Sequence, residues 1–428
     1  MINNAINAAL CLLTTIFLIR NFKKGLLLYT AAIFLAPVFI IASARISFEI
    51  LFFPVVFIIS LLKSTKISND KSLFGYFGYL FLFLIVSMFQ IILGNSSFPI
   101  MDMYAFFRFM FLVYLFHKNF KTDLVKNIDM ILTIVLIVNT VFCVCQMSGL
   151  LSVRFFYNLY YKESLYPLKG QLEIGSFSRA FGSFGSPLII ACVSALSFSF
   201  YLGTSMFNYE GEKVNHKLLK IAMSLVCGIL SMSKTVILSI PVIIVVALLY
   251  YLIESKKRGK KIKILIFFVA GLAVFLIGFF FLANYLNEKG YAINYYLSFL
   301  TNPLSSLDTR YSGNLVNTTA IIKSNILFGV GSAVFTDVYV GDSLYYSLLY
   351  QVGVVGLLLF LLPLFVVLLR SFNRNFKIEG LLIMCFLLIG VGSPVQLAFY
   401  TVPFVALFLK PLYSRRNYCE QRLAYNKI

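Results

Sequence analysis

The sequence predicts an all-α polytopic membrane protein, on three observations. Hydrophobic residues make up 60% of the 428 residues and charged residues only 12%, which leaves too little polar surface to cover a water-soluble globule. Apolar windows of about 17 to 25 residues, the length at which a helix crosses the hydrocarbon core of a bilayer, recur along nearly the whole chain. Lipid also forces each backbone group to pair within its own segment, so the spans are expected to be helical.

The apolar windows predict about thirteen transmembrane helices in a single transmembrane domain over residues 1–428. They are expected at about 3–19, 26–44, 46–62, 73–93, 103–116, 128–147, 186–205, 218–232, 235–253, 264–283, 344–369, 379–392 and 395–409. Two connections are long, 148–185 and 284–343, and the others are short. Long connections in a compact bundle usually carry function, so these two loops are where a site is expected.

The net charge of +20 has a topological explanation. When the spans are threaded alternately across the membrane, 26 of the 36 Lys and Arg residues fall on one side. By the positive-inside rule this side is cytoplasmic, which places the N-terminus outside and residues 410–428 in a cytoplasmic tail. Contacts of these loops with anionic membrane lipids account for the charge, so no nucleic-acid partner is expected.

The remaining basic residues lie on the outer side or inside spans, where topology does not require them. Most of them fall in the two long loops, together with a few carboxylates. These basic residues are Arg45, Arg108, Arg154, Lys162, Lys169, Arg179, Lys234, Lys289, Arg310 and Lys323. The outer face is therefore expected to form a chamber that binds anions.

Histidine and cysteine usage argues against several kinds of site. Both histidines, His117 and His216, fall in loops assigned to the cytoplasm, which removes imidazole from chemistry on the outer face. The seven cysteines lie mostly within spans and lack the paired spacing of a zinc site. The outer loops contain no Asp-x-Asp motif either. We therefore expect neither a metal nor a cofactor.

Short motifs occur in a fixed order from residue 140 onward. They are "VCQMSGLL" at 144–151, "RAFGSFGSPLIIA" from Arg179, "SMSKT" from Ser231, "NILFGVGS" from Asn325, and "GDSLYY" followed by "QVGVVG" from Gly341. In order, spacing and predicted topology they resemble the bacterial O-antigen polymerase and ligase superfamily, the Wzy-type polymerases and WaaL-like ligases. The resemblance covers about residues 140–395, with Lys234 where the family usually has an arginine.

That resemblance implies a GT-C-like membrane fold whose two long periplasmic loops contain short interfacial helices. It implies a glycosyltransferase of the bacterial inner membrane that moves a growing undecaprenyl-pyrophosphate-linked glycan onto a lipid-linked repeat unit at the periplasmic face. The product would be a surface polysaccharide such as O-antigen or capsule. A chain-length-determining co-polymerase is the protein partner that the family leads us to expect.

Release of pyrophosphate is the demanding step of such a transfer, and cations preset in a partly dry pocket stabilise the charge that develops. Guanidinium groups suit phosphate oxygens better than point charges do. We therefore expect Arg179 and Arg310 to bind the diphosphate and to act in catalysis. A structural alternative stands for each, because Arg179 could anchor the turn before Pro187 and Arg310 could pair with Asp308.

The incoming sugar hydroxyl needs a base, and Asp342, just before the span at 344–369, is the candidate. Asp342 is also suited to cap the N-terminus of that span, and the two roles are compatible. Glu173 is the alternative base. Ligases of this superfamily typically carry a histidine where this chain has Asp342 and its neighbours, so the sequence favours a polymerase.

Three further residues of the motifs are candidates for substrate binding. Lys234 lies at the outer boundary, where it would bind phosphate or glycan, or extend to the lipid headgroups. Gly329 and Gly331 permit a tight turn with unusual dihedral angles, and such a turn can also present backbone N–H groups to a phosphate. The choice between these roles stays open.

The other candidates lie inside or beside spans. Arg108 carries a costly intramembrane charge, which indicates guidance of the lipid pyrophosphate or a structural pairing. Gln146 would contact substrate or form an interhelical hydrogen bond, and Tyr311 would stack on a sugar ring. Arg45 and Glu49 stand four residues apart, so we expect an ion pair within one helix.

Two other functions stay open. A ligase would transfer the finished glycan to lipid A core, and a flippase would move the same lipid-linked unit across the membrane. A flippase should show pseudo-symmetric halves and polar residues along its midplane, whereas here the polar residues gather in two unequal outer loops. The sequence therefore favours a polymerase over both.

Overall fold

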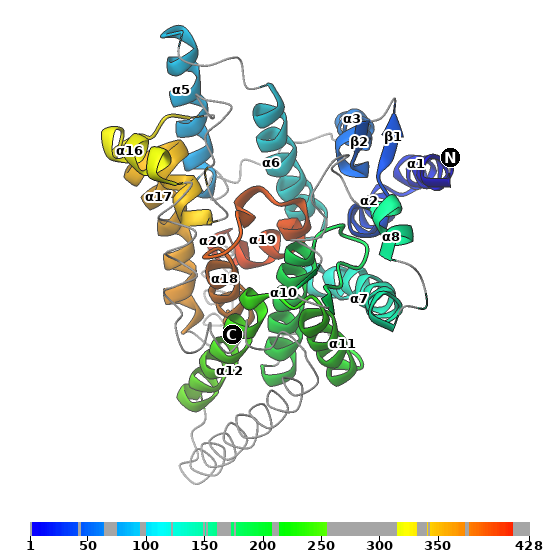
Figure 1. The fold of residues 1–428 in the computed structure, drawn as a ribbon. Helices are drawn as coiled ribbons and strands as arrows, with labels where there is room; N and C mark the ends of the chain where they lie inside the picture. Colours follow the sequence, from blue (N-terminus) through cyan, green and yellow to red (C-terminus); the bar gives the residue numbers. More distant parts are fainter. Residues whose placement is uncertain are drawn as a thin grey trace, which may run out of the picture.

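The computed structural model of the chain describes residues 2–41, 44–63, 75–94, 100–120, 123–148, 150, 153–160, 173–174, 177–207, 214–254, 315–331, 340, 343–372 and 376–413. The described part is mostly helical, and its helices pack in one bundle (Figure 1). The predicted span at 264–283, most of the second long loop and residues 414–428 lie outside the described residues.

Within its described residues, the N-terminal part contains three helices and one hairpin. Its elements are α1 (Ile2–Arg20), α2 (Phe22–Leu35), β1 (Phe39–Ile41), β2 (Ala44–Ile46) and α3 (Phe48–Lys63). The hairpin corrects the predicted span at 26–44, because α2 ends at Leu35 and the strands pair antiparallel with Ile40 opposite Arg45. The residue before a proline is pushed out of the helical region, and Ala36, which precedes Pro37, is indeed extended.

In the middle of the chain, six of the described helices coincide with predicted spans. They are α5 (Gly78–Ile92), α6 (Ile100–Phe120), α7 (Leu124–Ser148), α10 (Pro187–Met206), α11 (Lys217–Leu230) and α12 (Lys234–Glu254). Helix α10 packs against α11, α12 and α18. Its buried small residues, such as Ala191, Ala195 and Ser197, allow these helices to approach closely.

The C-terminal part departs from regular helices in two places. It contains α16 (Val316–Ser324), α17 (Leu344–Ser371), α18 (Lys377–Ile389), η1 (Val395–Leu397), η2 (Phe399–Thr401), α19 (Val402–Phe408) and α20 (Lys410–Tyr413). Helix α17 is broken at Gly353, where φ is 61° and ψ is −166°. The predicted span at 395–409 enters through the two 3₁₀ turns η1 and η2, so only its second half is α-helical.

Four of the described helices are long and apolar enough to cross a membrane, namely α1, α7, α10 and α17. This supports a helical, membrane-embedded protein. The count of thirteen spans and the orientation of the termini remain predictions.

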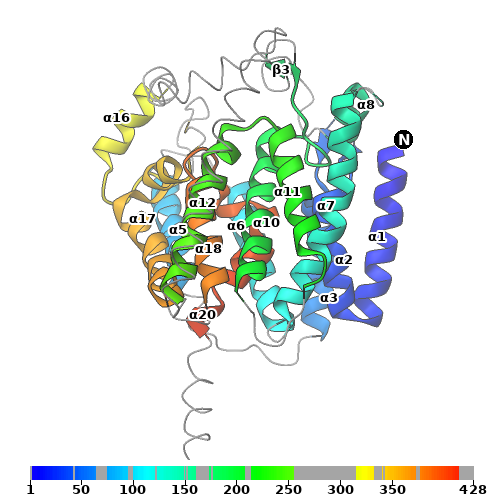
Figure 2. The ribbon, with the colours of Figure 1, turned by 90° about the horizontal axis from the view of Figure 1, so that it is seen from below.

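The bundle has two distinct ends (Figure 2). The loop end carries α8 (Val153–Tyr160), the small hairpin of β3 (Glu173–Ile174) and β4 (Phe177–Ser178), and α16. The opposite, tail end carries α20. Both long loops predicted from the sequence thus contain a short helix, and these two helices lie at the same end of the bundle.

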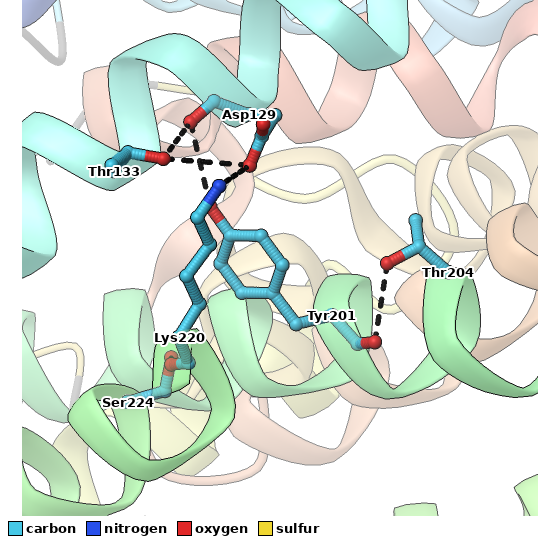
Figure 3. Close-up of polar contacts among 6 residues, drawn as sticks. All are labelled: Asp129, Thr133, Tyr201, Thr204, Lys220 and Ser224. Carbon is cyan, nitrogen blue, oxygen red and sulfur yellow. Dashed lines mark hydrogen bonds and ion pairs between the residues drawn. The ribbon is translucent and has the colours of Figure 1, made fainter. Parts of the chain in front are cut away.

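A largely buried ion pair joins α7 to α11 beside α10 (Figure 3). Lys220 Nζ on α11 lies 2.5 Å from Asp129 Oδ1 on α7. The Lys220 ammonium also lies 5.4 Å from the ring centre of Tyr201 on α10, and Thr133 Oγ1 donates to the Asp129 carbonyl at 2.6 Å. The early turns of α7 and α11 are therefore fixed to the last turns of α10, which runs antiparallel to both.

Candidate functional site at the loop end

The segment 179–186, "RAFGSFGS", leads into α10, and the end of α7 forms hydrogen bonds with its backbone. Gln146 Oε1 accepts hydrogen bonds from the backbone N–H groups of Phe181 at 3.0 Å and Gly182 at 3.1 Å. Its Nε2 donates to the Gly182 carbonyl at 3.3 Å. Gln146 is buried, so these bonds satisfy polar groups that water does not reach. Gln146 thereby bonds the loop backbone, an arrangement the sequence did not predict.

Asn139, two turns earlier on the same face of α7, makes a second clamp. Its Oδ1 accepts from the Ser183 N–H at 2.8 Å and from the Ser183 hydroxyl at 3.1 Å. The Phe34 carbonyl of α2 shares the single proton of this hydroxyl and is the nearer acceptor, at 2.6 Å. Sequence reasoning missed Asn139, although its spacing of seven residues from Gln146 in an apolar helix is a signal that could have found it.

Gly182 is required by this clamp. Its φ is +56°, a region that residues with a Cβ rarely adopt. A Cβ at this position would lie 2.1 Å from Asn139 Oδ1. The glycine therefore allows both the left-handed turn and the close approach of α7.

Arg179 lies on the turn between α11 and α12. Its Nε–H donates to the Ser231 carbonyl at 3.1 Å, and the neighbouring Ala180 N–H donates to the Leu230 carbonyl at 3.0 Å. The turn is tight, since Met232 has a φ of +48°. Lys234 follows as the first residue of α12 and is partly buried. Two predicted cations from separate motifs are thus brought to one junction.

The β3–β4 hairpin comes directly before Arg179. Its strands pair antiparallel, with Glu173 opposite Ser178 and Ile174 opposite Phe177. This register places Glu173, the alternative base, across from the residue that precedes Arg179. Glu173 and Arg179, a candidate base and a candidate phosphate ligand, therefore lie at the open end of the same hairpin.

Gly329 and Gly331 lie in a turn that inserts against the break in α17. Their φ angles are +68° and +72°. The N–H groups of Val330 and Gly331 donate to the carbonyls of Tyr350 at 2.9 Å and Gln351 at 2.8 Å. The Gly329 N–H donates to the Asn325 carbonyl at 2.8 Å. The prediction of a tight turn is confirmed, and these N–H groups are engaged with backbone carbonyls.

The break in α17 is complementary to that turn. The N–H groups of Val354 and Val355 donate to the carbonyls of Ile326 at 2.8 Å and Leu327 at 3.1 Å. The turn thus replaces hydrogen bonds that the helix loses at Gly353, as buried irregular backbone requires. Gly353 breaks the helix and also allows the turn to approach, since a Cβ there would lie 2.4 Å from the Leu327 backbone.

Three predicted site residues, Arg310, Tyr311 and Asp342, lie outside the described residues. The start of α17 next to them is described. Ser343 is the N-cap residue of α17, and the Leu344 N–H donates to the Gly390 carbonyl at 2.8 Å. Asp342 therefore immediately precedes the N-cap.

Arg108 lies inside α6 and is buried. Its guanidinium carbon lies 3.7 Å from the ring centre of Phe399 and 5.1 Å from that of Tyr104. Arg45 lies on β2, outside α3, so the one-helix geometry expected for a pair with Glu49 is wrong. Arg45 Nη1 donates to the Tyr157 carbonyl of α8 at 3.3 Å.

Among the described residues, no three His, Cys, Asp or Glu side chains are grouped so that they could hold a metal ion. Comparison with known protein families and with curated protein sequences finds no match to the chain.

Proposed function

We propose that the protein is a polysaccharide polymerase, which transfers an undecaprenyl-pyrophosphate-linked glycan onto a lipid-linked repeat unit at the outer face of the bacterial inner membrane. The observation that supports this most is the contact of Arg179 with Ser231. It joins the "RAFGSFGS" and "SMSKT" motifs, so that Arg179 and Lys234 lie at the loop end. An enzyme that must stabilise a leaving diphosphate needs cations fixed in this way.

The transfer exchanges one bond at the anomeric carbon for another. The acceptor hydroxyl oxygen forms a bond to the anomeric carbon. At the same time, the bond between the anomeric carbon and the pyrophosphate oxygen breaks. The hydroxyl proton passes to a carboxylate, Asp342 or Glu173, and undecaprenyl pyrophosphate leaves with the bonding electron pair. In this scheme Arg179 and Lys234, joined by Arg310, stabilise the charge that develops on the diphosphate.

Gln146, Asn139 and Gly182 serve the same step as positioning residues. Electrostatic stabilisation is effective only when the donors are held in place before the charge develops. The clamp on residues 181–183 fixes the backbone two residues after Arg179. We therefore expect loss of the clamp to lower the transfer rate even where the guanidinium is kept.

The test is elongation by purified protein in nanodiscs that contain a synthetic lipid-linked repeat unit. The proposal expects a ladder of longer lipid-linked glycans, with and without a chelator. Elongation that stops on chelation contradicts the metal-independent mechanism. A ligase would transfer glycan only when lipid A core is supplied, and a flippase would move the unit across the bilayer without lengthening it. Either of these results rejects the polymerase.

A further inference from the structure

Arg108 is a buried arginine, away from the clamp on residues 181–183, in which two nitrogen atoms lack a hydrogen-bond partner among the described residues. The residue is 4% exposed, and within the part of the chain that the structure describes its Nε and Nη1 atoms have no hydrogen-bond partner. The rings of Phe399 and Tyr104 lie against the guanidinium. Buried polar groups in folded proteins are nearly always paired, so donors of this kind point to a ligand that supplies acceptors.

The frame around Arg108 is fixed by its neighbours. Tyr104 OH donates to the Ile50 carbonyl of α3 at 2.8 Å, and Tyr29 OH donates to the Glu49 carbonyl at 3.2 Å. Glu49 is buried and close enough to interact electrostatically with Arg108, which offsets part of the guanidinium charge. It does not provide an acceptor for Nε or Nη1. The requirement for an acceptor therefore remains.

The surroundings of Arg108 fit a lipid-borne anion. Helix α6 reaches the surface of the bundle, because Phe107, the residue beside Arg108, is 46% exposed. A ligand that arrives within the bilayer can therefore approach this helix from the side. A guanidinium that lies between aromatic rings and has few hydrogen-bond acceptors around it is suited to bind phosphate or pyrophosphate oxygens.

We propose that Arg108 binds the phosphate group of a second lipid-linked substrate, separate from the diphosphate at Arg179. This assignment rests on the proposed function in one respect. A polymerase of this type holds two lipid-linked diphosphates at once, the donor that leaves and the acceptor that stays. Arg179 contacts the α11–α12 turn, whereas Arg108 contacts Tyr104 and Phe399, so the two arginines supply two separate cationic positions.

The experiment measures saturable binding of radiolabelled undecaprenyl pyrophosphate to the full chain in phosphatidylcholine nanodiscs. Wild-type protein should bind two equivalents, and Arg108→Met should bind one. Arg108→Lys keeps the charge and should weaken this site at least about tenfold, since a hydrogen bond to a charged group contributes roughly that much to affinity. Arg45→Met, which removes another arginine that contacts a tyrosine, should still bind two.

Competition assigns the source of the phosphate. Displacement by inorganic pyrophosphate at the same concentration indicates a site for the free anion, and displacement only by polyprenyl pyrophosphate indicates the lipid-borne group; both support phosphate binding at Arg108. Unchanged stoichiometry and affinity in folded Arg108→Met and Arg108→Lys overturn it. If Arg179→Met also binds two equivalents while Arg108→Met binds one, the proposed role of Arg179 fails and the Arg108 site stands.

Discussion

Arg179 Nε donates to the carbonyl of Ser231 over 3.1 Å, although the two residues are 52 positions apart in the chain. The bond ties the segment that enters α10 to the turn between α11 and α12. The contact gives Arg179 an anchoring role at the α11–α12 turn, a different turn from the one before Pro187 that the sequence suggested, and it sets the position of the guanidinium beside the first turn of α12. Anchoring and phosphate binding are compatible, because the guanidinium has five N–H donors.

Replacement of Gln146 by Leu should loosen the segment after Arg179. The variant leaves the buried N–H groups of Phe181 and Gly182 without their acceptor, and each such loss costs about 1–3 kcal/mol. We expect a lower unfolding temperature and a lower elongation rate. Asn127→Leu is the control on the same helix, because the Asn127 side-chain amide donates to the Asp123 carbonyl one turn earlier and, among the described residues, holds no other segment. Equal behaviour of the two variants would argue against the clamp.

Gly182→Ala should be far more damaging than Gly94→Ala. Both glycines have positive φ, +56° and +73°, so each alanine pays roughly 1–2 kcal/mol for the left-handed conformation. At Gly182 the new Cβ would also meet Asn139 Oδ1, at 2.1 Å, whereas no described atom lies within 4 Å of a Cβ at Gly94. Thermal unfolding of both variants in detergent measures the difference. A similar loss in both would mean that α7 does not approach this turn so closely.

Gly353→Ala should separate the 325–331 turn from α17. The new Cβ would lie 2.4 Å from the Leu327 backbone, so the turn must withdraw and its hydrogen bonds to α17 must break. Hydrogen exchange measures this directly, because the amides of Val330 and Gly331 should be protected in the wild-type protein and exchange faster in the variant. Gly78→Ala, whose Cβ would meet its nearest neighbour only at 4.0 Å, should leave that protection unchanged.

Lys220→Met should destabilise the bundle without acting on the site. It leaves Asp129 in a largely buried position without its cation, and removal of one partner of a buried pair costs up to about 3–5 kcal/mol. Lys220→Met combined with Asp129→Asn should recover part of that loss. Lys24→Met, at an exposed position, should stay within about 0.5 kcal/mol of wild type. Per folded molecule, elongation should be unchanged, since the pair lies at the opposite end.

The sequence predicted the elements that depend on local chemistry. Hydropathy located the helices, and the positive φ of Gly329 and Gly331 was expected from the residue type. What it missed depends on pairs of distant residues. The role of Asn139 depends on its hydrogen bond with Ser183. The break at Gly353 depends on the turn at 325–331, which supplies the hydrogen bonds that the helix loses. Apolar windows do not encode such pairings, because an intact span and a broken one have the same hydropathy.

The most direct test of the account is the rate of glycan elongation by Arg179→Met and Arg179→Lys, measured with purified, folded protein and a lipid-linked repeat unit. We predict that Arg179→Met lowers the maximal rate by roughly 10²- to 10³-fold, the effect of removing one preorganised donor, and that Arg179→Lys recovers only part of it. Elongation at the wild-type rate by folded Arg179→Met would contradict the claim that this guanidinium stabilises the leaving diphosphate.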